Sequence, residues 1–204
     1  GSADPEGPGL RYAWDLDGNG SFELSTGGVP RATKSFKQST TMTPSVRVLD
    51  PHGGEAVAAA SSTLTVDTIR PVISSFRTSS RTIATSARAS AAARRRSVRF
   101  RFRLSESARV RIAIERALAG RRKAGRCVAP SKARKRAKRC TRWRGVTTLR
   151  KQGKSGPNSV RFSGKVRGRA LRAGRYRAVA TAKDAVGNPS RRRKAGFSVA
   201  RVRR

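Results

Sequence analysis

Two cysteines are the residues whose type and spacing point most clearly to a specific chemistry. Cys127 and Cys140 have twelve residues between them. They cannot complete a four-ligand zinc site, because there is no further cysteine and the only histidine, His52, lies far away in the sequence. We therefore expect a disulfide, with two free thiols in a cytosolic protein as the alternative. Closing a loop of this size would stabilise the fold by about 3 kcal/mol, and a disulfide indicates an oxidising compartment.

Positive charge is the second chemical feature. The chain has 48 Lys and Arg against 11 Asp and Glu, a formal net charge of +37. Residues 1–67 have a net charge of −3, whereas residues 68–204 have a net charge of +40 and contain three acidic side chains. Such a field attracts any polyanion and weakens with salt. The candidate polyanion-binding residues lie in the densest basic runs: Arg121, Arg122, Lys123, Arg126, Lys132, Arg134, Lys135, Arg136, Lys138 and Arg139.

The partners that this charge predicts are an anionic cell-wall polymer or glycan, or nucleic acid bound without sequence preference. Aromatic side chains that could stack on bases are scarce, and only Trp143 lies beside a basic run. Each run also has a simpler interpretation as a solvated loop or sheet face. A GC-rich coding sequence produces an excess of Arg over Lys without selection for binding.

Catalysis is not expected, and neither is a cofactor. General acid and base chemistry needs paired carboxylates or a partnered His, and nucleophilic catalysis needs an activated Ser or Cys beside a base. The basic part of the chain has no His and three scattered carboxylates, and His52 lies in a Gly-rich turn. No Gly-rich phosphate-binding loop is found either. We predict no catalytic residues.

An acidic turn near the N-terminus partly matches a calcium-binding loop. Asp15, Asp17 and Asn19 place oxygen ligands at alternate positions around a Gly turn. The match then fails, because Glu23 falls at position nine and Thr26 occupies position twelve, where a bidentate Glu is needed. We expect a structural turn and no dedicated metal site, with weak calcium binding as the alternative.

The elements that carry these residues are expected to be β-strands. Val98, Phe100, Phe102 and Leu104 alternate with arginines, which places apolar side chains on one sheet face and guanidinium groups on the other. Similar alternation, punctuated by turns rich in Gly, Asn and Pro, recurs along both halves of the chain. The predicted fold class is all-β, with two Ig-like antiparallel β-sandwiches in tandem and the first incomplete at its N-terminus.

Two segments do not follow this pattern. Residues 78–97 have almost no large apolar side chain and are expected to be irregular. Residues 119–142 are too charged for a core, so we expect a long hairpin loop closed by the disulfide. No apolar run is long enough to span a membrane, and no membrane insertion is expected.

The first half resembles PKD domains, a family of small extracellular β-sandwiches. The resemblance rests on YAWDLDGNG at residues 12–20, SVRVLDPHGG at residues 45–54 and TLTVD at residues 63–67. It covers residues 3 to about 67 and lacks the first strands of the family. The resemblance implies a partial PKD-like sandwich over residues 1–67, open at one edge and marginally stable.

The second half resembles a bacterial Ig-like module of secreted proteins from high-GC bacteria. The sequence from Val66 to Pro71 is similar to the VDTxxP junction between tandem domains of this kind, which indicates a junction at residues 68–71 and a basic sandwich over residues 72–204. Leu171, Gly174 and Tyr176 resemble a tyrosine corner, and Asp184 resembles the holder of the last turn, a structural role.

These observations together predict a non-catalytic structural or adhesive module of a larger exported protein, located outside the cell or at its surface. The basic face is expected to bind polyanionic polymers or glycans. The alternative is a basic nucleic-acid-binding protein.

Overall fold

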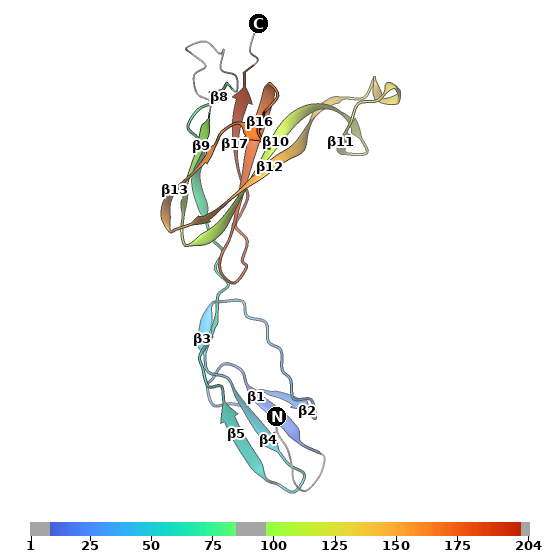
Figure 1. Cartoon of the computed structure of the whole chain (residues 1–204). Helices are drawn as coiled ribbons and strands as arrows, with labels where there is room; N and C mark the ends of the chain where they lie inside the picture. Colours follow the sequence, from blue (N-terminus) through green and yellow to red (C-terminus); the bar gives the residue numbers. More distant parts are fainter. Residues whose placement is uncertain (1–8, 85–96, 201–204) are drawn as a thin grey trace. The chain divides into compact units, whose positions relative to one another are not determined.

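Antiparallel β-strands make up most of the described chain, which divides into two compact units, Gly1–Ile69 and Arg70–Arg204 (Figure 1). The computed structural model describes residues 9–84 and 97–200. The predicted all-β fold class is confirmed. Within the described part of the chain, no helix is long and apolar enough to cross a membrane.

The first unit contains two antiparallel sheets. The larger sheet has the order β2-β1-β4-β5. Its strands are β1 (Arg11–Asp15), β2 (Leu24–Gly27), β4 (Ser45–Leu49) and β5 (Glu55–Ala59). The smaller sheet pairs β3 (Thr40–Met42) with β6 (Leu64–Val66).

The core of the first unit is small. Its buried apolar residues, among those described, are Tyr12, Ala13 and Met42. Every residue of β5 is exposed, and the apolar side chains of Val57 and Leu64 remain 56% and 49% exposed. Little apolar area is therefore removed from water in this unit, and its stabilisation by burial is correspondingly weak.

The second unit is a β-sandwich. One sheet has the order β13-β9-β7, with strands β7 (Ile73–Thr78), β9 (Val98–Leu104) and β13 (Gly156–Phe162). The other sheet has the order β11-β10-β16-β17-β8, with β12 on the free edge of β10. Its strands are β8 (Thr82–Ile83), β10 (Ala108–Lys123), β11 (Arg126–Val128), β12 (Arg139–Gly153), β16 (Gly174–Lys183) and β17 (Arg193–Val199). A small ribbon of β14 (Lys165–Val166) and β15 (Arg169–Ala170) lies outside both sheets.

A single apolar core joins the two sheets of the second unit. In β9 every second residue is buried and every other one exposed, as the alternation predicts. Phe100 packs against Phe76 of the same sheet and Phe197 of the opposite sheet, with both pairs of ring centroids 6.0 Å apart. Tyr176 stacks on Phe197 at 5.5 Å. The two inner faces thus interlock through aromatic rings, as in other β-sandwiches.

Strand structure extends into the segment that was expected to be a charged loop. Within residues 119–142, β10 continues to Lys123, β11 follows, and β12 begins at Arg139. Only the tip between β11 and β12, which includes a short 3-10 helix at Lys132–Arg134, departs from strand geometry. The prediction of a loop over this whole range was wrong, because backbone pairing holds strands together without alternating apolar side chains. The predicted irregular stretch at residues 78–97 includes β8, and residues 85–96 of it lie outside the described residues.

Candidate functional site: a disulfide-closed basic hairpin

The candidate polyanion-binding residues lie on a hairpin that extends beyond the sandwich. β16 pairs with β10 only as far as Arg116, whereas β12 continues to pair with β10 as far as Arg121. Residues 117–143, called the basic hairpin below, therefore leave the sheet and project away from it (Figure 1). The seven β10 residues beyond Arg116 span roughly 20 Å at strand spacing.

The base of the hairpin is marked by an irregularity in β12. Ile114 pairs with Thr147 and Glu115 pairs with Gly145, so Val146 is an extra residue in β12. Such a bulge bends a strand and increases its local twist. The bulge lies just before the point where the hairpin leaves the sandwich, and Val146 packs against the core there.

The tip of the hairpin is a three-stranded sheet curled around β10. Arg121 pairs with Val128 of β11 and with Arg139 of β12, which places β11 and β12 on opposite edges of β10. In a flat sheet, two strands separated by a third lie about 10 Å apart. The Cα atoms of Cys127 and Cys140, which belong to these two outer strands, are only 6.0 Å apart. The predicted disulfide between them is present and closes the curl.

Gly120 makes this closure possible. It is a buried residue of β10, opposite Cys140, and it faces the disulfide. A β-carbon at this position would collide with Cys127 Sγ and would stand 3.0 Å from Val128 O and 3.1 Å from Cys140 Sγ. The Cys127–Cys140 disulfide therefore crosses β10 at a residue that has no side chain.

Three of the predicted binding residues make hydrogen bonds within the hairpin. Arg121 donates a hydrogen bond to the Ala137 carbonyl at 2.8 Å, and Arg122 donates one to the Gly125 carbonyl at 2.8 Å. Arg134 donates to Ser131 Oγ at 3.1 Å. These three guanidinium groups fasten the tip. The other seven residues of the predicted set are exposed: Lys123, Arg126, Lys132, Lys135, Arg136, Lys138 and Arg139.

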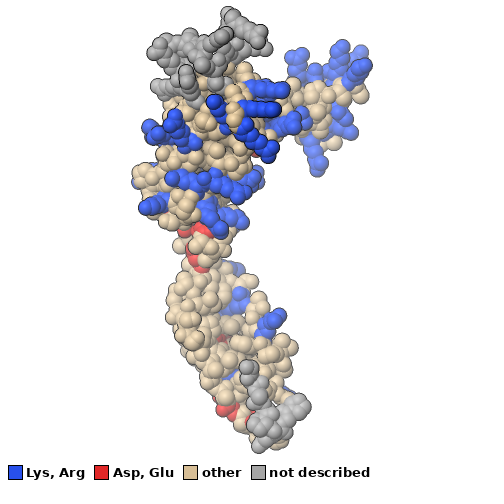
Figure 2. Space-filling view, viewed as in Figure 1, with Lys and Arg blue, Asp and Glu red and all other residues tan. Residues whose placement is uncertain are grey.

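The hairpin is strongly electropositive. No acidic residue occurs between Glu115 and Asp184 in the sequence, so the hairpin contains none. Lys and Arg side chains cover its surface, and others are spread over the rest of the second unit (Figure 2). The structure thus brings all ten predicted basic residues into one projecting element.

A residue cluster at the base of the hairpin was not predicted from the sequence. Arg177 of β16 donates a hydrogen bond to Glu115 of β10 at 2.6 Å, and its guanidinium carbon lies 4.2 Å from the centroid of the Trp143 ring. The two residues of the ion pair are 62 positions apart, and only the pairing of β10 with β16 brings them opposite each other. Trp143 is therefore already stacked on a cation.

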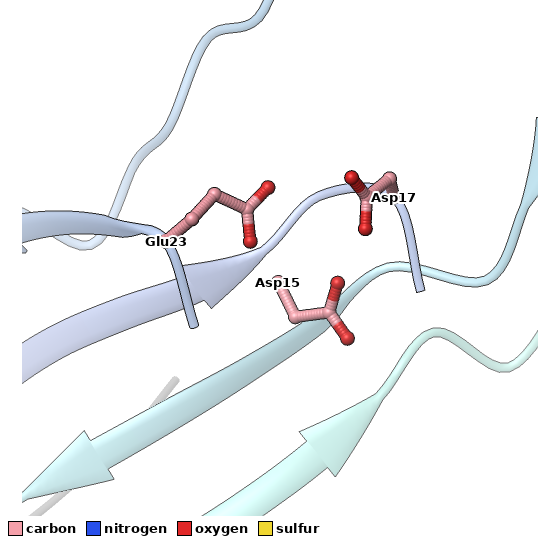
Figure 3. Close-up of side chains that lie close together, drawn as sticks. All are labelled: Asp15, Asp17 and Glu23. Carbon is pink, nitrogen blue, oxygen red and sulfur yellow. The ribbon is translucent and has the colours of Figure 1, made fainter. Parts of the chain in front are cut away.

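Of the candidate calcium residues, Asp15 is the last residue of β1 and Asp17 lies in the turn that follows (Figure 3). The carboxylates of Asp15, Asp17 and Glu23 have oxygen atoms within 4.8 Å of one another. Lys34 is the cationic partner of two of them, with its Nζ 2.9 Å from Glu23 Oε1 and 3.6 Å from Asp17 Oδ2. Asn19 Oδ1 accepts a hydrogen bond from the Ser21 amide at 2.7 Å.

Asp15 holds the turn together. Its Oδ1 accepts the Gly18 amide at 2.7 Å and its Oδ2 accepts the Gly20 amide at 2.8 Å. Burial opposes ionisation of this carboxyl, but the backbone donors at Gly20, Gly18 and Asn19 outweigh it and lower the pKa of Asp15. An ionised carboxylate that is satisfied by backbone N–H groups is typical of a structural turn.

The turn and corner residues of the second unit also have structural geometry. The Tyr176 hydroxyl donates to the Arg172 carbonyl at 2.7 Å, which is the tyrosine-corner contact that the sequence predicts. Asp184 Oδ1 accepts the amides of Gly187 and Asn188 at 2.7 Å and 2.8 Å. In the first unit, Asp50 likewise accepts the His52 amide at 2.8 Å.

Comparison with known proteins adds little to this geometry. No family model matches the chain, and no curated protein matches it. Fibronectin(III)-like modules of CbhA from Clostridium thermocellum are 8% identical, with a TM-score of 0.47 over 97% of this chain and 82% of theirs. The D00-D0 domain of intimin is 11% identical, with a TM-score of 0.34 over 95% of this chain and 86% of that domain.

A tetra-tandem repeat from the extending region of a large adhesion protein is 14% identical, with a TM-score of 0.31 over 93% of this chain and 41% of the repeat. Likenesses at these identities and TM-scores carry no argument about what this chain does. None of them bears specifically on PKD domains, so that resemblance stays a prediction.

Proposed function

We propose that this chain is a non-catalytic structural and adhesive module of a larger exported protein, and that its basic hairpin binds anionic polymers at the cell surface. The observation that carries the proposal is the hairpin itself. It projects from a well-packed sandwich, it is closed by a disulfide, and it presents exposed Lys and Arg side chains with no acidic residue among them.

The charge of the hairpin supports binding to a polyanion. Each Lys or Arg that neutralises an anionic group releases condensed counterions, so affinity grows with the number of contacts and falls steeply with salt. Eight of the predicted residues are exposed on the hairpin, and seven of them remain for such contacts when Arg122, which bonds to the Gly125 carbonyl, is set aside.

The disulfide supports both polyanion binding by the hairpin and a location outside the cell or on its surface. It holds two outer strands together at the tip, so less freedom of the chain is lost when a ligand binds. Disulfides of this kind persist in oxidising compartments, which favours a position outside the cell or on its surface.

The alternative function, recognition of nucleic acid, has less support from the hairpin. Base recognition by single-strand binders uses aromatic platforms. Trp143, the one aromatic residue beside the basic runs, stacks on Arg177. Nucleic acid would then be bound through its phosphates alone.

The test is a binding titration of the full chain against duplex DNA, single-stranded RNA, a sulfated glycan and a glycerol-phosphate polymer, each at about 50 mM and 200 mM salt. The variant replaces four exposed hairpin residues, Lys132→Gln, Lys135→Gln, Arg136→Gln and Lys138→Gln. The matched control replaces four exposed residues on the outer face of the larger sheet, Arg109→Gln, Arg111→Gln, Arg150→Gln and Lys183→Gln.

We expect the hairpin variant to lose at least tenfold more affinity for the anionic polymers than the control. Equal losses in the two variants would contradict a role for the hairpin. Sequence-dependent binding of DNA or RNA that survives the higher salt would favour the nucleic-acid function instead.

A further inference from the structure

A second basic surface lies on the opposite side of the sandwich from the sheet that carries the hairpin. The outward-facing residues of β7, β9 and β13 include five exposed arginines, called the arginine face below: Arg77, Arg99, Arg101, Arg103 and Arg161. The three strands contain no acidic residue. No carboxylate on these strands can therefore neutralise the guanidinium groups.

Strand pairing places four of these five arginines opposite one another, in two pairs. Arg99 pairs with Arg161 of β13, and Arg101 pairs with Arg77 of β7. Like charges in directly opposite positions of a sheet repel each other and destabilise it. The larger sheet also places Arg111 opposite Arg150, but its outer face includes Glu115, which pairs with Arg177. The described strands of the arginine face provide no such carboxylate, and a bound anion would relieve the repulsion.

The arginine face also has a hollow shaped by an irregular backbone. β7 has one extra residue between Ser74 and Arg77, and Ser75 adopts a left-handed conformation with φ of 51°. This conformation is uncommon for a residue other than Gly and tends to occur at functional sites. The hollow has a volume of about 370 Å³, and its polar lining consists of Ser75, Asn158, Ser159 and the arginines at positions 77, 99, 101 and 103. Phe102 and Pro157 complete the lining. Serine hydroxyls and guanidinium groups together are typical donors to a phosphate.

The spacing of the arginines indicates the kind of polymer that fits. Arg99, Arg101 and Arg103 are two residues apart along β9, so their backbone anchors are separated by about 7 Å. Two residues comprise six backbone bonds, and any extended chain of six single bonds per repeat spans a similar length of about 7 Å. A phosphodiester polymer with a three-carbon unit between phosphates has this repeat. Its successive phosphates can face successive arginines.

One further argument favours phosphodiesters over acidic polypeptides, and one observation argues against recognition of bases. The anions of a phosphodiester polymer lie in its main chain, whereas acidic polypeptides carry theirs on flexible side chains that lose rotational freedom on binding. The aromatic side chains of the three strands, Phe76, Phe100, Phe102 and Phe162, belong to the core or pack against it. Phe102 also lines the hollow but is only 2% exposed, so the described residues of the arginine face offer no exposed ring on which a base could stack.

We infer that the arginine face binds linear phosphodiester polymers through their phosphates, without reading bases, and that the hollow at Ser75 holds one phosphate. This site is distinct from the basic hairpin and would remain if the hairpin had no ligand. A glycerol-phosphate polymer and the backbone of a nucleic acid share this chemistry, and the experiment measures both, so that tighter binding of one of them identifies the source.

The test compares two triple variants of the full chain, each made with the hairpin intact and with the four hairpin substitutions described above. One replaces Arg99, Arg101 and Arg103 with Gln. The other, a control with the same change in charge, replaces Arg109, Arg111 and Arg150 with Gln. Binding of a glycerol-phosphate polymer, an oligodeoxynucleotide, its abasic analogue and polyglutamate is measured over a range of salt. Circular dichroism and thermal unfolding confirm that each variant is folded.

We expect the glycerol-phosphate polymer to bind the chain whose hairpin is neutralised, and the arginine-face triple to weaken that binding at least tenfold more than the control triple. The slope of log K against log salt should become shallower by about 2, as expected when three phosphate contacts to a single strand are lost. The oligodeoxynucleotide and its abasic analogue should bind equally, and polyglutamate more weakly. Ser75→Ala, which removes one hydroxyl from the hollow, should reduce binding by a smaller factor than the arginine-face triple.

Several results would overturn the inference. Equal effects of the two triple variants would show that only total charge matters. A preference of more than tenfold for the oligonucleotide that has bases would show base recognition, and equal binding of polyglutamate would exclude selection of phosphates. Loss of all binding on neutralising the hairpin alone would refute the arginine face and leave the proposed hairpin function standing. The opposite result would contradict the proposed hairpin function and support the arginine face: the chain with the neutralised hairpin would still bind, and only the arginine-face triple would lose binding.

Discussion

The Sγ atom of Cys127 lies against Gly120, in the space that a β-carbon at position 120 would occupy. The disulfide and the glycine are therefore one structural unit, although they belong to different strands of the curled tip. Neither residue can be changed without consequence for the other.

Gly120→Ala should destabilise the hairpin or prevent its disulfide from closing. The added methyl group would meet Cys127 Sγ and Val128 O, and overpacking of this kind typically costs about 1–3 kcal/mol. The fraction of free thiols, measured by mass spectrometry after alkylation, and the midpoint of chemical unfolding report the effect. Gly145→Ala is the control, because a β-carbon there meets nothing within 4 Å. Identical behaviour of the two variants would show that the tip is not packed as described.

Reduction of the disulfide should expose the hairpin to trypsin while leaving the sandwich folded. Beyond Arg116 the hairpin has no pairing with β16, so its order depends on its own strands and on the Cys127–Cys140 link. In the chain-entropy model, loss of a link that closes such a loop costs about 3 kcal/mol. Peptide mapping should locate the early cleavages at Lys and Arg within residues 117–143. Early cleavage within β9 instead would show that the link stabilises the sandwich as a whole.

Tyr176→Phe should destabilise the second unit by about 1 kcal/mol at neutral pH, because the hydrogen bond to the Arg172 carbonyl is lost. Burial raises the pKa of Tyr176 above its ordinary value of 10.0. A raised pKa in the folded state means that stability is fully present below the unfolded pKa and is lost as pH rises through the folded one. The difference in unfolding free energy between the wild-type chain and Tyr176→Phe should therefore shrink above pH 10. A constant difference across this range would contradict the buried hydroxyl.

Asp184→Asn should destabilise the second unit at neutral pH, and the effect should disappear in acid. Burial opposes ionisation of Asp184, but backbone and side-chain donors of Asn188 and the Gly187 amide outweigh it and lower its pKa below 3.8. A lowered pKa contributes stability above the unfolded value of 3.8, and this stability is lost as pH falls through the folded value. Denaturant unfolding of both proteins from pH 7 to pH 3 measures the convergence. Parallel curves would mean that the charge of Asp184 contributes nothing.

The sandwich of the second unit could be predicted because its strands carry alternating residues. In β9 the period of two is complete, and the structure buries the apolar set and exposes the arginines. The tyrosine corner could be predicted from the resemblance of Leu171, Gly174 and Tyr176 to that motif, and the disulfide from two cysteines that cannot complete a zinc site.

Other features of the site lacked a sequence pattern. The end of β10, with Arg121, Arg122 and Lys123 in succession, has no alternation, and its strand structure comes from backbone pairing with β11 and β12. The ion pair of Glu115 with Arg177 depends on the register of two strands 62 residues apart. The need for Gly120 becomes visible only once the two sulfur atoms are placed above it.

The continuity of β10 has a mechanical consequence. The same strand forms the middle of the curled tip and, at Arg109–Arg116, lies between β12 and β16 in the sandwich. A pull on the tip along the hairpin therefore acts lengthwise on β10, and the hydrogen bonds between antiparallel strands lie across that direction. These bonds are strained together rather than opened one after another, so the hairpin is anchored to resist tension along its own axis.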